Sequence, residues 1–237
     1  MADPWMRWRA ATKARIGLGR SGDALPTKAL LDFELAHSRA RDAVHGTVDF
    51  AALAKSLPEP SIHVRSQAAD RLTYLRRPDL GRRLDADCDL PRGGCDLAFV
   101  IADGLSARAV EAHAVPLLQA VLGRLDGWTI APIVLAEQAR VALGDEIGAR
   151  LGTACVAVLI GERPGLSAAD SLGIYLTWDP KPGRRDAERN CISNIHGGGL
   201  DTDSAARMLV WLLSEARRRK LSGIDLKLDT AALSNST

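Results

Sequence analysis

The sequence lacks three features that would assign the protein to a membrane, a secretory route or a redox class. No hydrophobic run reaches the roughly 18 residues that a membrane-spanning helix needs, and the N-terminus has no apolar stretch typical of a signal peptide. No two cysteines have Cys-X-X-Cys spacing, so neither a zinc knuckle nor a thioredoxin-type site is indicated. We therefore expect a cytoplasmic protein with free thiols. The four cysteines are Cys88, Cys95, Cys155 and Cys191.

The sequence also has no excess of one charge, since 31 Lys and Arg residues face 29 Asp and Glu residues for a formal net charge of +2. A nucleic-acid-binding protein normally carries a strongly basic face, so this balance argues against that class. Two nucleotide-binding motifs are missing as well. No Gly-X-Gly-X-X-Gly sequence follows the apolar run that ends at Ala102, and no Walker A sequence occurs. NAD and ATP are therefore disfavoured as ligands.

The apolar content is sufficient for a core, because 46% of the 237 residues are hydrophobic and 25% are charged. The first ninety residues are predicted to form helices and turns, with an amphipathic helix over residues 29–44. Residues 88–94, which contain one proline and two glycines, are the best linker candidate. These features divide the chain into an N-terminal helical segment, residues 1–90, and a second domain, residues 91–237.

The second domain alternates strands with helices. Continuous apolar runs predict strands that are buried on both faces, over residues 96–102, 128–135, 154–160 and 173–178. Helices are predicted after Ser106, which can cap the first of them, and over residues 137–151 and 203–219. Pro116 should kink or split the first of these helices. The alternation predicts an α/β fold with a doubly wound parallel sheet.

Ligands of open α/β sheets bind outside the carboxyl ends of the strands. Three glycine-containing segments are predicted to lie there, over residues 103–106, 161–165 and 190–199. Glycine allows the backbone to approach a ligand closely. From the residues alone, the prediction is a mononucleotide-like cleft whose ligand is not named.

Six segments, taken in order, resemble the small subunit (light chain) of ethanolamine ammonia-lyase. They are Arg15 to Gly22, Ala36 to Asp42, Tyr74 to Leu84, Val100 to Ser106, Gly161 to Leu166 (GERPGL) and Cys191 to His196 (CISNIH). The resemblance covers roughly residues 10–228. It implies a Rossmann-like C-terminal domain that holds adenosylcobalamin against a TIM-barrel large subunit, and the large subunit provides most of the contacts to ethanolamine. The complex would convert ethanolamine to acetaldehyde and ammonia by a radical mechanism, with no catalytic acid or base in this chain.

The resemblance also implies three cofactor contacts, at Val141, Glu162 and Cys191. A carboxylate at Glu162 can accept hydrogen bonds from the cofactor, and the other two side chains offer small apolar contacts to a flat ring. Each residue has a structural alternative: Glu162 as a surface carboxylate in a turn, Val141 as a core-facing helix residue, and Cys191 as a buried thiol.

His196 is considered separately, because Asn194-Ile195-His196-Gly197-Gly198-Gly199 has the spacing of the Asp-X-His-X-X-Gly motif of other B12 proteins. In those proteins the histidine binds cobalt and a carboxylate orients it. Here Asn194 replaces the aspartate, and the family resembled keeps the cofactor's own base on cobalt. We therefore assign no metal ligand in this chain.

The N-terminal helical segment is predicted to dock on the large subunit. Four arginines flank a probable turn and are suited to pairing with a partner's carboxylates, although solvated side chains are the alternative. They are Arg76, Arg77, Arg82 and Arg83. The chain starts almost at the shared region, which argues against delivery to a bacterial microcompartment by an N-terminal extension. The alternative function is a stand-alone α/β nucleotide-binding or regulatory protein.

Overall fold

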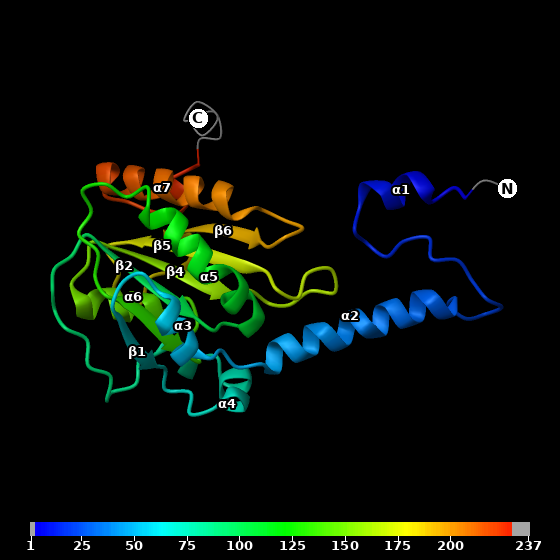
Figure 1. Cartoon of the computed structure of the whole chain (residues 1–237), viewed down its shortest axis with the longest axis horizontal. Helices are drawn as coiled ribbons and strands as arrows, with labels where there is room; N and C mark the ends of the chain where they lie inside the picture. Colours follow the sequence, from blue (N-terminus) through cyan, green and yellow to red (C-terminus); the bar gives the residue numbers. More distant parts are fainter. Residues whose placement is uncertain (1–2, 229–237) are drawn as a thin grey trace.

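A single six-stranded sheet organises the protein in the computed structural model, which describes residues 3–228 (Figure 1). The strands are β1 (Ser61–Arg65), β2 (Leu97–Ala102), β3 (Ile133–Glu137), β4 (Cys155–Gly161), β5 (Leu172–Trp178) and β6 (Arg189–Ile195). They lie side by side in the order β1-β3-β2-β4-β5-β6. The helices are α1 (Met6–Ala11), α2 (Thr27–His45), α3 (Phe50–Ser56), α4 (Arg71–Arg76), α5 (Ala107–Leu122), α6 (Leu143–Leu151) and α7 (Thr202–Arg219).

The α/β class is confirmed, but the prediction of a wholly parallel sheet is wrong. Strands β1 to β4 are parallel, whereas β5 runs antiparallel to β4 and β6 runs antiparallel to β5. The connections explain the difference. A parallel neighbour needs a crossover of a dozen or more residues, usually a helix, and the loops over residues 162–171 and 179–188 contain no α-helix. The sheet is therefore mixed.

Both faces of the sheet are covered by apolar packing. Helices α5 and α7 pack together on one face against residues such as Phe99, Ile101 and Leu159. Helix α6 packs on the other face, against Val156 and Val158 among others. Because β2 and β4 are buried on both faces, their sequences are apolar throughout, as the sequence analysis expected.

Helix boundaries partly follow the sequence signals. The hydroxyl of Ser106 accepts a hydrogen bond from the amide of Ala109 and caps α5, as predicted. Helix α5 then continues through Pro116 without being split, because the turns around it are held in the core by Ala114, Leu117 and Leu118. Helix α6 begins six residues later than predicted, since the backbone leaves β3 with Gln138 in a left-handed conformation (φ 53°).

The stretch predicted as an N-terminal helical segment also contributes a strand. Strand β1 pairs with β3 at the edge of the sheet, and its polar alternation, Ser-Ile-His-Val-Arg, gave no buried-strand signal. Before it, α1 and α2 project from the body of the protein (Figure 1). We call residues 3–45 the N-terminal arm. Within α2 only Ala43 is buried, so the helix packs on the domain only near its C-terminal end.

Among residues 3–228, none of the helices has the length and apolarity that a membrane crossing requires.

Candidate functional site

The order of the strands reverses at β2, which places a crevice at the carboxyl edge of the sheet. The chain moves from β2 through α5 to β3 on one side, then returns through α6 to β4 on the other side. Because α5 and α6 lie on opposite faces, the loops that follow β2 and β3 separate there. A hollow of about 410 Å³ lies at this edge. Its lining includes Gly104, Leu105, Arg140, Val141, Gly161, Glu162 and Tyr175.

Two glycines allow the loop after β2 to cross the end of β4. Gly104 has φ +58°, and a Cβ there would lie 2.2 Å from the carbonyl oxygen of Gly161. A Cβ at Gly161 would in turn lie 2.2 Å from the carbonyl oxygen of Ser106. The amide of Leu105 donates to the Gly161 carbonyl at 2.9 Å. Only glycine at both positions permits this approach, so the hollow depends on them.

Glu162 is held by two donors on one oxygen. The Ser171 hydroxyl donates to Oε2 at 2.5 Å, and the backbone amide of Asn194 donates to the same atom at 3.1 Å. Within residues 3–228, Oε1 has no hydrogen-bond partner, and a Cβ at Gly173 would lie 2.9 Å from it. Glu162 therefore borders the hollow with one oxygen saturated and the other available, which is more than an ordinary turn carboxylate offers.

Val141 shares the hollow with Glu162, and Cys191 lies beside it. Val141 lies in the loop before α6 rather than inside that helix. Cys191 is opposite Tyr175 in the β5–β6 register, and Tyr175 lines the hollow. Cys191 is exposed, so the alternative of a buried thiol is wrong for this residue. Partial desolvation raises the pKa of its thiol, Tyr175 opposes this shift and the Glu162 carboxylate adds to it, so the thiol is neutral at pH 7.

Tyr74 also lines the hollow, although the sequence analysis gave this residue no role in the site. Its buried ring lies between two guanidinium groups, 4.9 Å from Arg71 and 4.1 Å from Arg140. Its hydroxyl donates to the carbonyl of Ala139 at 3.0 Å. This stack fastens α4 to the loop after β3. The sequence does not indicate it, because Arg140 is 66 residues from Tyr74 in the chain.

Asp103, the first residue after β2, ties the two separating loops together. Its carboxylate accepts hydrogen bonds at 2.9 Å from the amides of Gly104, Gln138 and Ala139. Burial raises the pKa of Asp103 to about 6, although these amides and Arg71 oppose the shift. Most Asp103 side chains are therefore ionised at pH 7, and the charge is paired with Arg71, whose Nη1 lies 3.4 Å from Oδ2.

His196 is engaged at both ring nitrogens. The Gly198 amide donates to Nδ1 at 3.1 Å, so Nε2 carries the proton and donates to Asn194 Oδ1 at 2.9 Å. The histidine thus supports the loop that also supplies an amide to Glu162. In the described part of the chain, no group of three or more His, Cys, Asp or Glu side chains is arranged to hold a metal ion.

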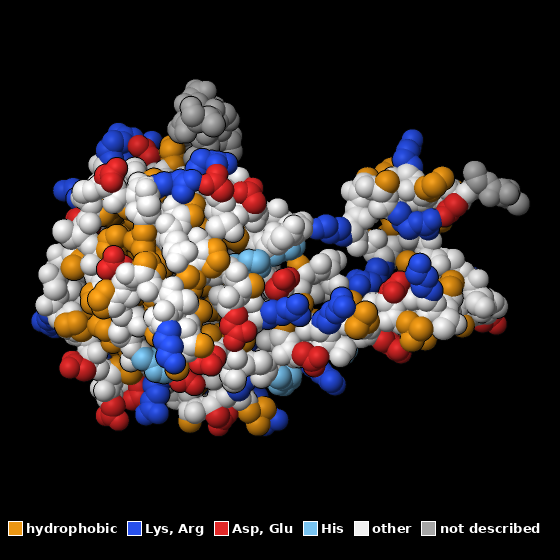
Figure 2. Space-filling view, viewed as in Figure 1, with side chains coloured by type: hydrophobic (Ala, Val, Ile, Leu, Met, Phe, Trp, Pro, Cys, Tyr) orange, Lys and Arg blue, Asp and Glu red, His pale blue; other side chains and the backbone are white. Residues whose placement is uncertain are grey.

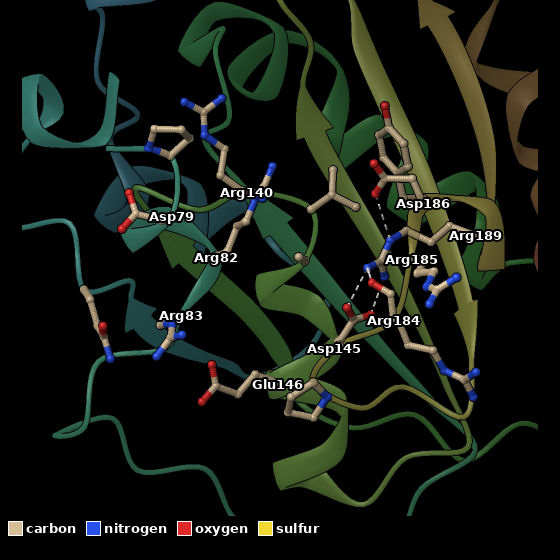
Figure 3. Close-up of a pocket in the computed structure, with 17 residues that line it drawn as sticks. Asp79, Arg82, Arg83, Arg140, Asp145, Glu146, Arg184, Arg185, Asp186 and Arg189 are labelled. Atoms are coloured by element: carbon tan, nitrogen blue, oxygen red, sulfur yellow. Dashed lines mark hydrogen bonds and ion pairs between the residues drawn. The ribbon is translucent and has the colours of Figure 1, made fainter. Parts of the chain in front are cut away.

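A larger cleft of about 1000 Å³ continues from the first hollow, with Arg140, Val141 and Tyr175 lining both (Figure 3). Arg82, Arg83 and Arg140 lie on one side of this cleft, and Arg184 and Arg185 lie on the other side. We call it the arginine cleft. At its base, Arg189 forms a buried two-contact ion pair with Asp145, at 2.5 and 2.7 Å.

Comparison with known proteins assigns this architecture to a family. Residues 2–227 match the family described as Ethanolamine ammonia-lyase light chain (EutC). The chain belongs to the ethanolamine ammonia-lyase small-subunit family. The ethanolamine ammonia-lyase small subunit of Bradyrhizobium diazoefficiens is 54% identical to it, over 96% of this chain and 92% of the relative. The small subunits of Pseudomonas putida and Azotobacter vinelandii are each 52% identical, over 95% of this chain and 88% of each relative. The resemblance in the six sequence segments is therefore confirmed, and the chain is part of a lyase.

Proposed function

We propose that this chain is the cofactor-binding small subunit of an adenosylcobalamin-dependent ethanolamine ammonia-lyase, which acts with a large subunit to convert ethanolamine to acetaldehyde and ammonia. The observation that carries the proposal is the free Oε1 of Glu162 at the carboxyl edge of the sheet, in a hollow shared with Val141 and bordered by Tyr175 and Cys191. Family membership indicates which reaction is catalysed, and the hollow is the part of this chain that we propose binds the cofactor. In this proposal the parallel strands β1 to β4 form the Rossmann-like part of the domain.

The face of β5 and β6 beside this hollow fits a flat ring system. Leu172, Ile174 and Leu176 point to the α5–α7 face, so Tyr175 and its register partner Cys191 lie on the opposite face. Helix α6 packs over β2 and β4, whereas the α-helices that pack most extensively against β5 and β6 are α5 and α7 on the other side. The missing Cβ of Gly173 leaves room for the Glu162 carboxylate against β5. This face therefore borders the hollow, with the Glu162 carboxylate as a hydrogen-bond acceptor beside it.

When bound, adenosylcobalamin would supply the radical chemistry of the reaction. The residues of this chain would position and shield it. Glu162 Oε1 would accept a hydrogen bond from an amide or hydroxyl at the ring's edge, while Val141 and Cys191 exclude water from its surface. The bonds from Ser171 and Asn194 fix the Glu162 carboxylate before the cofactor arrives, which reduces the entropy lost on binding.

The N-terminal arm is proposed to dock on the large subunit. Its helix α2 exposes four large apolar side chains between charged ones, as Figure 2 shows for this part of the molecule. They are Leu30, Leu31, Phe33 and Leu35. Several large apolar side chains exposed on one helix are typical of an interaction site in soluble proteins. Lys13 and Arg15 also bond the carbonyls of Gly198 and Leu166, so the arm contacts the loops that follow β6 and β4.

The proposed function is tested by co-expressing this chain with an ethanolamine ammonia-lyase large subunit. The purified pair should release acetaldehyde from ethanolamine when adenosylcobalamin is added, and each chain alone should be inactive. The reason is that this chain offers a cofactor surface and no identifiable substrate-binding group. Turnover by the small subunit alone would contradict this division of roles, as would a pair that works without the cofactor.

Substituting Glu162→Ala should raise the dissociation constant for adenosylcobalamin about tenfold or more. A polar group of the buried cofactor would lose its acceptor, a loss of about 1–3 kcal/mol. The measurement is equilibrium ultrafiltration of the cofactor with the assembled enzyme, so that no turnover is needed. Glu59→Ala removes an equally charged side chain from an exposed loop and is the matched control. If the Glu162→Ala and Glu59→Ala enzymes had equal dissociation constants for the cofactor, Glu162 would be a turn residue without a role in cofactor binding.

A further inference from the structure

We infer that the arginine cleft binds the phosphodiester of the cofactor's nucleotide tail, and this inference rests on the proposed function. Adenosylcobalamin carries one anionic linkage, the phosphodiester that joins its benzimidazole ribonucleotide to the corrin side chain. The sequence analysis assigned two of the arginines of this cleft, Arg82 and Arg83, to docking and gave the others no role. Their joint position emerges only from the fold (Figure 3).

The acidic residues of the cleft already have cationic partners. Asp145 and Asp186 lie against Arg189, at 2.5 and 3.6 Å. Glu146 lies 3.4 Å from Arg150, and Asp79 lies 2.7 Å from Arg77. Each of the four carboxylates thus has an ion-pair partner, with Asp145 and Asp186 sharing Arg189, and none of them lies within ion-pair distance of Arg82, Arg83 or Arg185.

The basic residues, in contrast, exceed their internal partners. Arg189 and Arg184 are engaged by carboxylates, and Arg140 stacks on Tyr74. Among residues 3–228, the three remaining arginines of the cleft make no ion pair: Arg82, Arg83 and Arg185. The buried Nε of Arg140 also has no hydrogen-bond partner in this part of the chain. The cleft therefore presents unused donors and uncompensated positive charge, which is the arrangement that binds phosphate oxygens.

The position of the cleft favours a tail of the same cofactor over an acidic side chain of a partner protein. The tail is covalently attached to the corrin, so its phosphate must bind within reach of the ring. Arg140, Val141 and Tyr175 line both the hollow at Glu162 and the arginine cleft, which makes the two continuous. The cleft holds about 1000 Å³, and apolar groups such as Val141, Ala142 and Pro182 line it beside the arginines. This combination suits an aromatic base linked to a phosphate.

The inference is tested by removing the charge from opposite walls of the cleft and by removing the phosphate from the ligand. The assembled enzyme carries Arg82→Gln together with Arg185→Gln, and Arg92→Gln in an exposed loop is the control for loss of charge. Binding of adenosylcobalamin is compared with binding of adenosylcobinamide, which lacks the nucleotide and its phosphodiester. Equilibrium ultrafiltration measures both dissociation constants without turnover. Size-exclusion chromatography checks assembly.

The double variant should bind adenosylcobalamin about tenfold or more weakly than wild type, because charge-assisted hydrogen bonds to the phosphate are lost. Its affinity for adenosylcobinamide should match that of wild type. An equal loss of affinity for both ligands, or no loss of affinity for either, would overturn the inference. A variant that fails to assemble would assign the arginines to the large subunit instead and would also overturn it.

A charge-retaining pair provides a second measurement that does not depend on adenosylcobinamide. Arg82→Lys with Arg185→Lys should recover most of the adenosylcobalamin affinity lost in the glutamine pair, since phosphate still meets two cations. A lysine pair as weak as the glutamine pair would contradict a charge-based site. The proposed function has its own contradicting result: wild-type assembled enzyme that binds neither adenosylcobalamin nor adenosylcobinamide.

Discussion

A chain that begins at Asp42 is expected to fold and yet fail to co-purify with the large subunit. Removing residues 1–41 deletes the exposed apolar face of α2, whereas the sheet and its two apolar layers stay intact, because within α2 only Ala43 is buried. A stable contact between permanent subunits typically buries upward of about 2,000 Å². The loss of the arm should reduce recovery of the complex at least about tenfold, as measured by affinity capture through a tagged large subunit.

Two controls separate docking from folding. The truncated chain should keep the thermal midpoint and far-ultraviolet spectrum of a folded α/β domain, because Tyr74 and β1 remain. A point-variant pair, Leu31→Glu with Leu35→Glu, should weaken capture as truncation does, since both side chains are exposed and lie one helical turn apart. Arg39→Gln on the same helix should not. If the truncated chain still assembled and supported full activity, the docking role of the arm would be wrong.

Replacing Arg189 with methionine should destabilise the small subunit by about 3–5 kcal/mol, because it leaves a buried carboxylate without its partner. Arg189 and Asp145 are each only 2% exposed. Burial already raises the pKa of Asp145, and Arg189 opposes that shift. The guanidinium also bonds the Thr177 hydroxyl and the Arg184 carbonyl, so it joins α6 to β5 and to the loop before β6. Urea unfolding followed by circular dichroism measures the change.

The double variant Asp145→Leu with Arg189→Met distinguishes an unpaired charge from lost packing. Removing both charges should restore stability to within about 2 kcal/mol of wild type, since the cost of burying a lone ion disappears. A double variant that stays as unstable as Arg189→Met would show that the lost bonds to Thr177 and Arg184, and not the unpaired carboxylate, cause the destabilisation. The exposed pair of Arg207 and Asp203 on α7 is a suitable reference, and breaking it should change stability by less than about 1 kcal/mol.

The parts of the fold that sequence predicts best are those decided locally. The apolar runs of β2 and β4 are recognisable because burial on both faces leaves no polar position. Ser106 and the long amphipathic α7 are similarly set by neighbours in the chain. The direction of β5 and β6 is not local, because an apolar run looks the same whichever way its neighbour runs. Only the absence of a helix in the loops 162–171 and 179–188 indicates it.

The candidate site also contains features that sequence can indicate and features that only the fold brings together. Val141, Glu162 and Cys191 came from a family resemblance. The position after a strand selected the segments that contain Glu162 and Cys191, but no local pattern selected the individual residues. Their assignment as cofactor contacts stays a prediction, although the structure puts Val141 and Glu162 in one hollow. The arginine cleft could not be predicted, since Arg82 and Arg185 are distant in sequence and are brought together by loops at the sheet's edge. The role of Tyr74 could not be predicted either, since Ala139 and Arg140, which it contacts, are distant from it in sequence.

The position of β1 has a consequence for how the protein is made on the ribosome. Ser61 of β1 pairs with Ile133 of β3, so this strand emerges long before its partner has been synthesised. Helix α2 precedes β1, and a helix needs only contacts between near neighbours, which form in about a microsecond. Strand pairing over such a separation must wait for chain elongation and loop closure. We therefore expect α2 to be helical, with its apolar side chains exposed, while the sheet of the nascent chain is still incomplete. Binding to the large subunit can then begin during translation.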